Sequence, residues 1–398
     1  MRFSTATLVV GLGLSACTVD GELATSVDES PVIGGANAPA GKWPDAVAVL
    51  WSGEQACTGT LIAPTVVLTA GHCVEFDPPN GVLVGASALS KASEGETIRI
   101  AKAIDYPGSQ NSVDVGILVL EKPSTIEPRP IASGWARFDI KNGAAIELVG
   151  FGTIDSGGRT PTDVLQEATS TITDFNCTTS RGCNTAARPD GELGAGGMGI
   201  DTCPGDSGGP LYLTTDYGTF VAGVTSRAYD NARTACSEGG IYGRPDKIID
   251  WIDQITGVKV ARGPTPEAVA IMTSRGEAGE TKITVNDPKS SDHTFAIVTP
   301  PDNGRAAVSE SGTVRVCPNR DVVGDDLVVV GVTDAADPSR SLQVPIPILI
   351  ADGSPPDDCD ETAFGDDGGC CDSRRGAGGS IPLALIVLGL LGRRRRRE

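Results

Sequence analysis

Residues 201–210 read DTCPGDSGGP, a stretch in which glycines and prolines surround a single serine. Glycine has no Cβ and adopts positive φ angles readily, so this stretch can turn tightly. Such a turn leaves the backbone amides of Gly205 and Ser207 free to point at one oxygen atom, where they would stabilise a developing negative charge. We therefore predict Ser207 as a nucleophile and the two amides as an oxyanion hole.

A serine hydroxyl becomes an effective nucleophile when a base takes its proton and a second group orients that base. His72, in LTAGHC (68–73), is the only histidine in this part of the chain, and a neutral imidazole accepts a proton readily near pH 7. Asp114 precedes the apolar run VGILVL, where a carboxylate is costly unless it accepts a hydrogen bond. We predict a catalytic triad of His72, Asp114 and Ser207.

The three motifs TAGHC, DVGILVL and DTCPGDSGGP, in that order, resemble the chymotrypsin/trypsin family of serine proteases over residues 32 to about 256. The resemblance implies an all-β protein with two six-stranded antiparallel β-barrels and a C-terminal helix, and an active site in the cleft between the barrels. It also implies a serine endopeptidase that hydrolyses peptide bonds through an acyl-enzyme. Protein or peptide substrates would be its partners.

The pattern of residues agrees with an all-β fold. Short β-type runs separated by turn residues fill residues 32–245, and apolar residues at helical spacing follow at 246–255. Beyond GPTP at 263–266, further strand-like runs predict a small β-sandwich-like module that resembles bacterial cadherin-like or immunoglobulin-like modules. The predicted divisions are a signal peptide with a lipobox at 1–17, a propeptide at 18–31, a trypsin-like protease domain at 32–257, a linker at 258–266, the β module at 267–350, an acidic spacer at 351–369 and a C-terminal sorting signal at 370–398.

The family resemblance also assigns the substrate pocket. Asp201 occupies the family position at the base of the primary specificity pocket, where a carboxylate favours Arg or Lys before the scissile bond. Gly240 matches a glycine of the pocket wall, and Ser226 matches the serine that supports the catalytic aspartate. Ala228 replaces a glycine at the pocket mouth, and Arg227 replaces a tryptophan and brings a positive charge close to a basic substrate. A preference for small apolar residues therefore remains an alternative.

The stretch VIGG (32–35) resembles the new N-terminus that this family gains when its zymogen is cut. The freed amine of Val32 would pair with Asp206 and set up the oxyanion hole. Pro31 departs from the pattern, because trypsin-like activators cut after a basic residue. We therefore expect a different, activating protease to cut after Pro31.

Export is predicted from the N-terminus, where Arg2 precedes an apolar run too short to span a bilayer. LSAC (14–17) resembles the lipobox of bacterial lipoproteins, in which the cysteine, here Cys17, is lipidated; an ordinary signal peptide with a chance cysteine is the alternative. Export implies a compartment in which disulfides form. Family resemblance pairs Cys57 with Cys73, Cys177 with Cys183 across a shorter loop than usual, and Cys203 with Cys236, and it leaves Cys317 and Cys359 as a candidate pair.

The C-terminus combines Cys370 and Cys371, an apolar run at 381–391 and five arginines at 393–397. This combination resembles the C-terminal sorting signal of myxobacterial surface proteins, which implies sorting machinery as a partner. A simple tail anchor is the alternative. We expect a secreted protein held at the outer membrane or cell surface of a Gram-negative bacterium.

Charge and spacing exclude other classes of function. The net charge of -19 argues against nucleic-acid binding, which requires a basic face. No His, Cys and acid spacing suggests zinc, so we expect no metal and no cofactor. GAGGMG (194–199) matches a dinucleotide-binding pattern but lacks the flanking βαβ unit, so it is interpreted as a flexible surface loop. We expect a monomer, with a binding or adhesion protein in a protease fold as the alternative to an enzyme.

Overall fold

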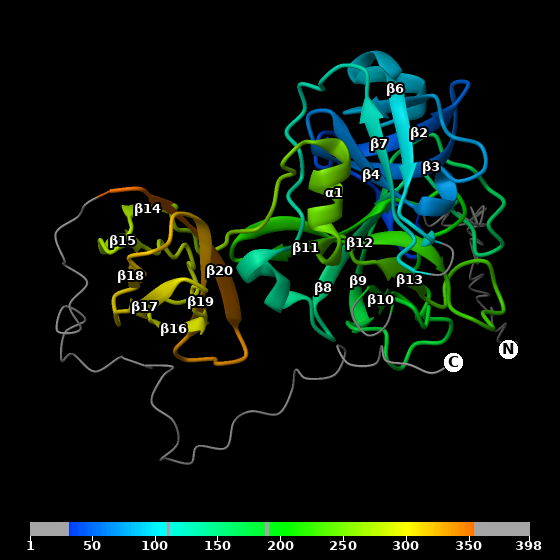
Figure 1. The fold of residues 1–398 in the computed structure, drawn as a ribbon. Helices are drawn as coiled ribbons and strands as arrows, with labels where there is room; N and C mark the ends of the chain where they lie inside the picture. The colour runs from blue at the N-terminus through cyan, green and yellow to red at the C-terminus, as the bar shows by residue number, and fades with distance from the viewer. Residues whose placement is uncertain (1–31, 110–111, 188–190, 354–398) are drawn as a thin grey trace, which may run out of the picture.

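The computed structural model describes residues 32–109, 112–187 and 191–353 (Figure 1). Two barrels of antiparallel strands form the larger part, and a smaller pair of sheets follows them in the chain. The predicted signal peptide, propeptide and sorting signal lie outside the described residues, as does most of the predicted acidic spacer.

The first barrel closes in the order β2-β3-β4-β7-β6-β5. Side chains alternate along its strands: Val47 and Val49 on β2 pack in a core to which all six strands contribute. Ala48 and Leu50 point the other way, into a core shared with the second barrel. The strands are β2 (Ala46–Trp51), β3 (Glu54–Ala63), β4 (Val66–Thr69), β5 (Gly81–Val84), β6 (Glu96–Asp105) and β7 (Gly116–Leu120).

The second barrel runs β8-β9-β10-β13-β12-β11, and pairing of β11 with β8 closes it. The short strand β1 (Ala36–Asn37) adds to the outside of β9. The other strands are β8 (Ala145–Gly150), β9 (Gln166–Asp174), β10 (Glu192–Ala195), β11 (Pro210–Thr215), β12 (Gly218–Ala228) and β13 (Gly240–Gly243). The 3-10 turns are η1 (Gly71–Cys73), η2 (Leu89–Glu94), η4 (Gly134–Asp139) and η5 (Pro245–Lys247).

Helix α1 (Ile249–Thr256) follows the second barrel and packs on the first (Figure 1). Its buried Ile249 and Ile252 belong to the core shared by both barrels, and Trp251 meets Tyr106 edge-on with ring centroids 4.9 Å apart. Gly257 ends the helix at φ 69°, a conformation that favours glycine. The predicted fold of two six-stranded barrels followed by a helix is confirmed. No helix in the described ranges is long and apolar enough to cross a membrane.

The C-terminal module is a sandwich of two sheets. A four-stranded sheet β14-β20-β19-β16 faces a three-stranded sheet β15-β18-β17 across a shared apolar core. Strand β20 alternates buried and exposed residues along its length, as expected when one face packs inward. The strands are β14 (Ile271–Ser274), β15 (Gly279–Lys282), β16 (His293–Thr299), β17 (Gly304–Val308), β18 (Thr313–Pro318), β19 (Gly324–Asp334) and β20 (Ser341–Ala351). Cys317 is a buried free thiol, and Cys359 lies outside the described residues.

The segment predicted as a linker is held against the barrels by backbone hydrogen bonds. The amide of Ala261 donates to the Ile62 carbonyl at 3.0 Å, and the amide of Trp135 donates to the Pro264 carbonyl at 2.9 Å. Trp135 is fully buried and belongs to the core of the module, although it comes from turn η4 next to the second barrel. The module is therefore docked on the protease domain.

Candidate active site

Strand pairing brings His72 and Asp114 together across 42 positions of sequence. His72 lies on η1, directly after β4, and Asp114 directly before β7, and β4 and β7 are antiparallel neighbours in the first barrel. The Nδ1 of His72 lies 2.8 Å from Oδ2 of Asp114, and the His72 amide donates to Oδ1 at 3.0 Å. Both carboxylate oxygens therefore hold the histidine, which fixes the orientation of the imidazole.

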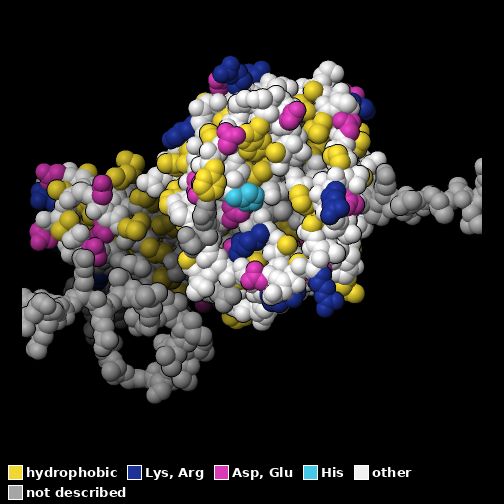
Figure 2. All heavy atoms as spheres, turned by 90° about the vertical axis from the view of Figure 1, so that its right-hand side faces the viewer, with side chains coloured by type: hydrophobic (Ala, Val, Ile, Leu, Met, Phe, Trp, Pro, Cys, Tyr) yellow, Lys and Arg dark blue, Asp and Glu magenta, His cyan; other side chains and the backbone are white. Residues whose placement is uncertain are grey.

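The surroundings of the pair suit a base and its orienting acid. Burial alone would raise the pKa of Asp114, but hydrogen bonds from His72 and from the Ser226 hydroxyl, at 2.7 Å, lower it below its ordinary value. Burial lowers the pKa of His72, and the hydrogen bond and charge of Asp114 outweigh that effect and raise it. The His72 side chain is 41% exposed, and Figure 2 shows a histidine (cyan) open to solvent beside acidic and basic side chains.

Ser207 lies just before β11 in the second barrel, and its backbone contacts the segment that carries the histidine. Its carbonyl accepts a hydrogen bond from the Thr58 amide at 2.8 Å and lies 3.8 Å from Sγ of Cys73, the residue after the histidine. The neighbouring Gly208 has φ 81°, and a Cβ there would lie 2.1 Å from Oγ1 of Thr69. Only glycine fits at this position, so the loop that carries Ser207 can pack against β4, the strand that leads to His72.

The amides of Gly205 and Ser207 donate to no acceptor within the described part of the chain. Gly205 has φ 99°, and its carbonyl accepts hydrogen bonds from Oγ1 of Thr58 at 2.8 Å and Nε2 of Gln55 at 2.9 Å. These bonds hold the carbonyl toward the first barrel. Two neighbouring amides thus remain available to a bound oxygen atom.

A cavity of ≈ 480 Å³ opens beside Gly205. Gln55 and Leu89 line it from the first barrel, and Phe151 and Pro204 line it from the second. The loop that carries Gly205 and Ser207 therefore lies at a cleft to which both barrels contribute.

Asp206 and Val32 are both buried in the second barrel. The Asp206 carboxylate is 0% exposed and accepts hydrogen bonds from the amides of Gly152 at 2.7 Å and Cys203 at 2.8 Å. Among the residues that the structure describes, no basic group forms an ion pair with it. Burial raises its pKa to about 7 despite the two hydrogen bonds. Within the described residues, the Asp206 carboxylate is thus buried without a cation beside it.

The residues predicted for the substrate pocket gather around Asp201. Its carboxylate, 2% exposed, accepts hydrogen bonds at 2.9 Å from the amides of Ser237, Gly239 and Thr202. Burial raises the pKa of Asp201 to about 6 against these three bonds. A Cβ on Gly240 would lie 2.8 Å from the Arg227 carbonyl oxygen and 3.7 Å from Oδ1 of Asp201, so only glycine fits beside the carboxylate at this position.

Two further residues complete the pocket wall. Ala228 is exposed and pairs with Gly240 in the β12–β13 ladder, which places its methyl group at the edge of the pocket. Gly196, from the stretch interpreted as a surface loop, has a Cβ position 3.5 Å from Oδ1 of Asp201. Gly194 and Ala195 of that stretch form the buried end of strand β10, so the prediction of a flexible surface loop was wrong for this part of it.

Arg227 does not present the free positive charge that the sequence suggested. Its NH1 and NH2 groups donate to both carboxylate oxygens of Glu192, at 2.8 and 3.1 Å, and NH2 also donates to the Gly182 carbonyl at 2.8 Å. Glu192 is buried on β10, with a side chain 1% exposed. Sequence analysis missed Glu192 because no motif links it to a residue 35 positions away.

The structure contains the disulfides Cys57–Cys73, Cys177–Cys183 and Cys203–Cys236, as family resemblance implied. The first lies beside His72, and the third joins the segment of Asp201 to the facing wall of the pocket. Two clusters in the described ranges are compact enough to hold a metal ion, but both include disulfide-bonded cysteines. Such cysteines cannot supply thiolate ligands.

The paired barrels and the Asp–His pair at their junction define the class of chymotrypsin-fold serine proteases. The family model described as Trypsin matches residues 32–252, and the chain belongs to this family. It is 32% identical over 260 residues to "Glucanase inhibitor protein 3" of Phytophthora infestans, covering 62% of this chain and 95% of that protein. It is 31% identical over 246 residues to "Trypsin-1" of Astacus astacus, covering 56% and 98%.

Among solved structures, the chain is similar to the secreted serine protease VesC from Vibrio cholerae, with a TM-score of 0.47 and 19% identity. The match covers 81% of this chain and 72% of that one. The family assignment places this chain among the trypsin-like serine proteases, and such a protease acts on protein substrates.

Proposed function

We propose that this protease is an endopeptidase made as a zymogen, and that it cleaves after Arg or Lys. The observation that carries the proposal is the His72–Asp114 pair, together with two neighbouring amides that have no acceptor among the described residues. Ser207 would attack the scissile carbonyl while His72 takes its proton through Nε2. Asp114 holds the other ring nitrogen and stabilises the imidazolium that forms.

The oxyanion of the tetrahedral intermediate would accept hydrogen bonds from the amides of Gly205 and Ser207. His72 then gives its proton to the leaving amine, and the acyl group remains on Ser207. A water molecule then attacks the acyl carbon while His72 takes its proton. The second tetrahedral intermediate collapses as the ester bond breaks and His72 returns the proton to the Ser207 oxygen, which releases the carboxylic acid product. No metal or cofactor is required for these steps.

The preference for basic residues rests on Asp201. Its carboxylate is buried beside Gly196 and Gly240, where a guanidinium or ammonium group would find a charge partner. Arg227 does not oppose such a substrate, because Glu192 compensates its charge. Ala228 narrows the pocket by one methyl group.

The zymogen proposal rests on Asp206. The amine freed by a cut after Pro31 would supply a cation to a buried carboxylate that lacks one among the described residues. Ile33 is already in place, because its carbonyl accepts a hydrogen bond from the Asp201 amide at 3.2 Å. We propose that a separate protease makes the cut, since Pro31 is not a basic residue.

We further propose that the chain is exported and works as a monomer. Three disulfides in the protease domain suit an oxidising compartment. Lipidation at Cys17 and processing of the tail at 370–398 by sorting machinery would place the protein at the outer membrane or cell surface. Mass spectrometry of the mature termini tests both modifications.

A non-catalytic binding function is the second candidate, favoured by similarity to a protein named as a glucanase inhibitor. The two functions can be separated with a full-length chain in which the residues just before Val32 are replaced by the recognition sequence of a site-specific protease. That protease then makes the cut after position 31. After that cut, we expect an uncharged fluorophosphonate probe to label Ser207 and peptides ending in Arg or Lys to be cleaved. An activated chain that does neither would be a binding protein.

Replacement of Asp201 by serine tests the specificity. Removing the buried carboxylate should lower kcat/KM for Arg and Lys substrates by at least about 10²-fold, because a charge-assisted pair is lost in the pocket. Labelling of Ser207 by the uncharged probe should change little. Ala228→Gly is the matched control at the pocket mouth, and we expect it to keep the basic preference. If Asp201→Ser also keeps it, Asp201 is not the determinant.

The pKa of Asp206 predicts how stability depends on pH before activation. The folded-state pKa of about 7 lies above the ordinary value of 3.8, so the folded chain holds this proton more tightly than the unfolded chain. The stabilisation that comes from this proton is complete below pH 4 and is lost as pH rises through 7. The uncut chain should lose on the order of a few kcal/mol of unfolding free energy over this range.

Urea unfolding at a series of pH values measures this loss. The cut chain should lose less stability over the same range, because the Val32 amine favours the ionised carboxylate. Asp206→Asn should flatten the dependence of the unfolding free energy of the uncut chain on pH. Asp201 is present in the uncut chain, the cut chain and the variant, so its contribution to that dependence drops out of the comparison. Equal slopes for the cut and uncut chains would contradict the pairing of Val32 with Asp206.

A further inference from the structure

A continuous chain of hydrogen bonds leads from β10 to the catalytic histidine. Glu192 accepts from Arg227, whose NH1 group also donates to Oγ of Ser226 at 3.0 Å. Ser226 donates to Oδ2 of Asp114 at 2.7 Å, and the same carboxylate oxygen lies 2.8 Å from Nδ1 of His72. Two residues with no place in the mechanism above, Glu192 and Arg227, are thus connected to it.

The direction of each bond follows from what the groups can donate. A guanidinium only donates, so Oγ of Ser226 must accept from Arg227 with a lone pair. The single hydroxyl proton of Ser226 is then left to point at Asp114. Arg227 therefore reinforces the orientation in which the Ser226 hydroxyl donates to Asp114, because it occupies the acceptor side of Oγ.

Arg227 is itself held rigidly. Glu192 binds it through both carboxylate oxygens, and the carbonyl of Gly182, inside the Cys177–Cys183 disulfide loop, accepts a further bond from NH2. The second oxygen of Glu192 also accepts from the Asn184 amide at 2.7 Å. A carboxylate as buried as that of Glu192 is costly unless paired, so the glutamate requires the arginine.

We propose that Arg227 and Glu192 form a positioning pair that orients Ser226 toward Asp114 and balances the charge beside His72. The proposal builds on the catalytic role of His72 proposed above. The pair does not touch the reacting atoms and acts only through Ser226 and through its electric field.

The field has a definite sign at each position. The charged groups that face His72 are Asp114 and Glu75, which raise its pKa, and Arg227, which lowers it. Asp105 lies next to Asp114 and Glu75, close to the turn that carries the histidine. The negative charge of Glu192 offsets the positive charge of Arg227. Removing one member of the pair should therefore move the His72 pKa in the direction opposite to removing the other.

The full chain contains two histidines, so NMR of histidine-labelled protein can follow His72 directly. We expect Arg227→Gln to raise its titration midpoint by roughly half a pH unit and Glu192→Gln to lower it by a similar amount. The double variant should return to the wild-type midpoint, because both charges are gone. His293, buried in the C-terminal module, serves as the internal reference.

A second measurement separates hydrogen bonding from charge. It uses the rate at which an uncharged probe labels Ser207, which should not depend on Asp201. At high pH this rate reaches a plateau, and the plateau should be about fivefold lower in Arg227→Gln. Arg227→Lys should keep the wild-type midpoint but also lose plateau rate, because an ammonium group cannot hold Glu192, Gly182 and Ser226 together. Lys282→Gln, an exposed lysine of the module, is the control for loss of one charge and should change neither quantity.

Opposite shifts of the His72 midpoint support the positioning pair. Shifts in the same direction, or none beyond that of Lys282→Gln, overturn it, since general damage to the fold has no reason to reverse sign. A wild-type chain in which Ser207 is never labelled would instead defeat the proposed function, and the NMR titration would still report on the pair.

Discussion

Replacement of Asp114 by asparagine is expected to lower kcat by about 10⁴-fold, with little change in KM. The carboxylate receives hydrogen bonds from the His72 ring and amide and from Ser226, so it is saturated with donors. An asparagine presents an NH₂ group toward one of these donors. The imidazole would then adopt the tautomer with its proton on Nε2, which cannot accept the proton of Ser207.

Pre-steady-state acylation of the activated chain measures this loss at the chemical step. The matched control is Asp105→Asn, a nearby partly buried carboxyl whose pKa is raised by burial and which makes no bond to His72. We expect that control to stay within about threefold of wild type, as is usual for a residue outside the reacting set. A comparable loss in both variants would show that the negative field, rather than the Asp114 hydrogen bonds, supports catalysis.

The barrels and the turns around Ser207 could be anticipated because each depends on a local pattern. Gly205 and Gly208 adopt positive φ angles that the spacing of glycines predicted, and the apolar run after Asp114 became strand β7. The disulfide partners followed from family resemblance and are present in the structure. For the turn and the strand, neighbouring residues carry enough information to specify the conformation.

The compensation of Arg227 could not be anticipated in the same way. Glu192 meets it only because β10 and β12 both pair with β13, and strand order is not written in any short motif. The His293 side chain is only 5% exposed for a similar reason: its ring lies against Trp135, with centroids 5.4 Å apart, across the boundary between module and barrel. Contacts that depend on how separate units dock are set by the complete fold.

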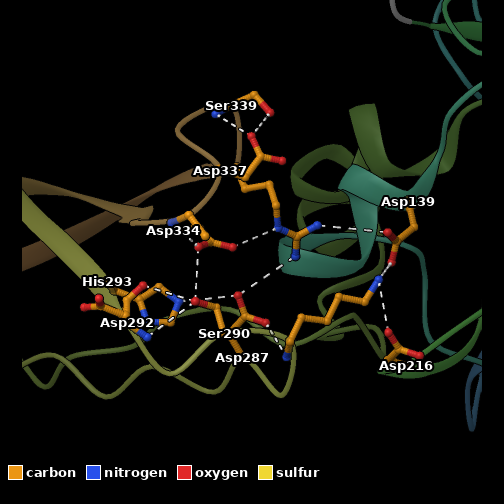
Figure 3. A network of polar contacts seen from close by, with 12 residues as sticks. Asp139, Asp216, Asp287, Ser290, Asp292, His293, Asp334, Asp337 and Ser339 are labelled. Carbon is orange, nitrogen blue, oxygen red and sulfur yellow. Dashed lines mark hydrogen bonds and ion pairs between the residues drawn. The ribbon is translucent and has the colours of Figure 1, made fainter.

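That boundary is a mixed apolar and ionic interface. Trp135 inserts from η4 into the core of the module, where Phe138 and the Arg340 guanidinium also contact it. Around it, Lys289 of the module pairs with Asp139 at 2.7 Å and with Asp216 at 3.5 Å (Figure 3). Figure 3 shows these aspartates reaching from the protease side toward the loops of the module. Both the apolar contact and the ion pairs thus cross from one domain to the other.

Replacement of Trp135 by alanine should therefore lower the unfolding free energy by about 3–5 kcal/mol. The indole is fully buried, and its removal leaves a cavity between two domains that backbone bonds hold in place. Because the tryptophan belongs to the core of the module yet is part of the protease domain, we expect calorimetry to show the two domains unfolding together in the wild type. In the variant, the module should unfold first.

Met272→Ala is the matched control, since that side chain is 79% exposed on the same module. An exposed substitution of this kind should change the unfolding free energy by less than about 0.5 kcal/mol. If Trp135→Ala leaves the module transition unchanged, the docking seen here does not stabilise the module. If it lowers the module transition while Ser207 labelling persists, the module depends on the protease domain for stability, and the triad does not depend on the module.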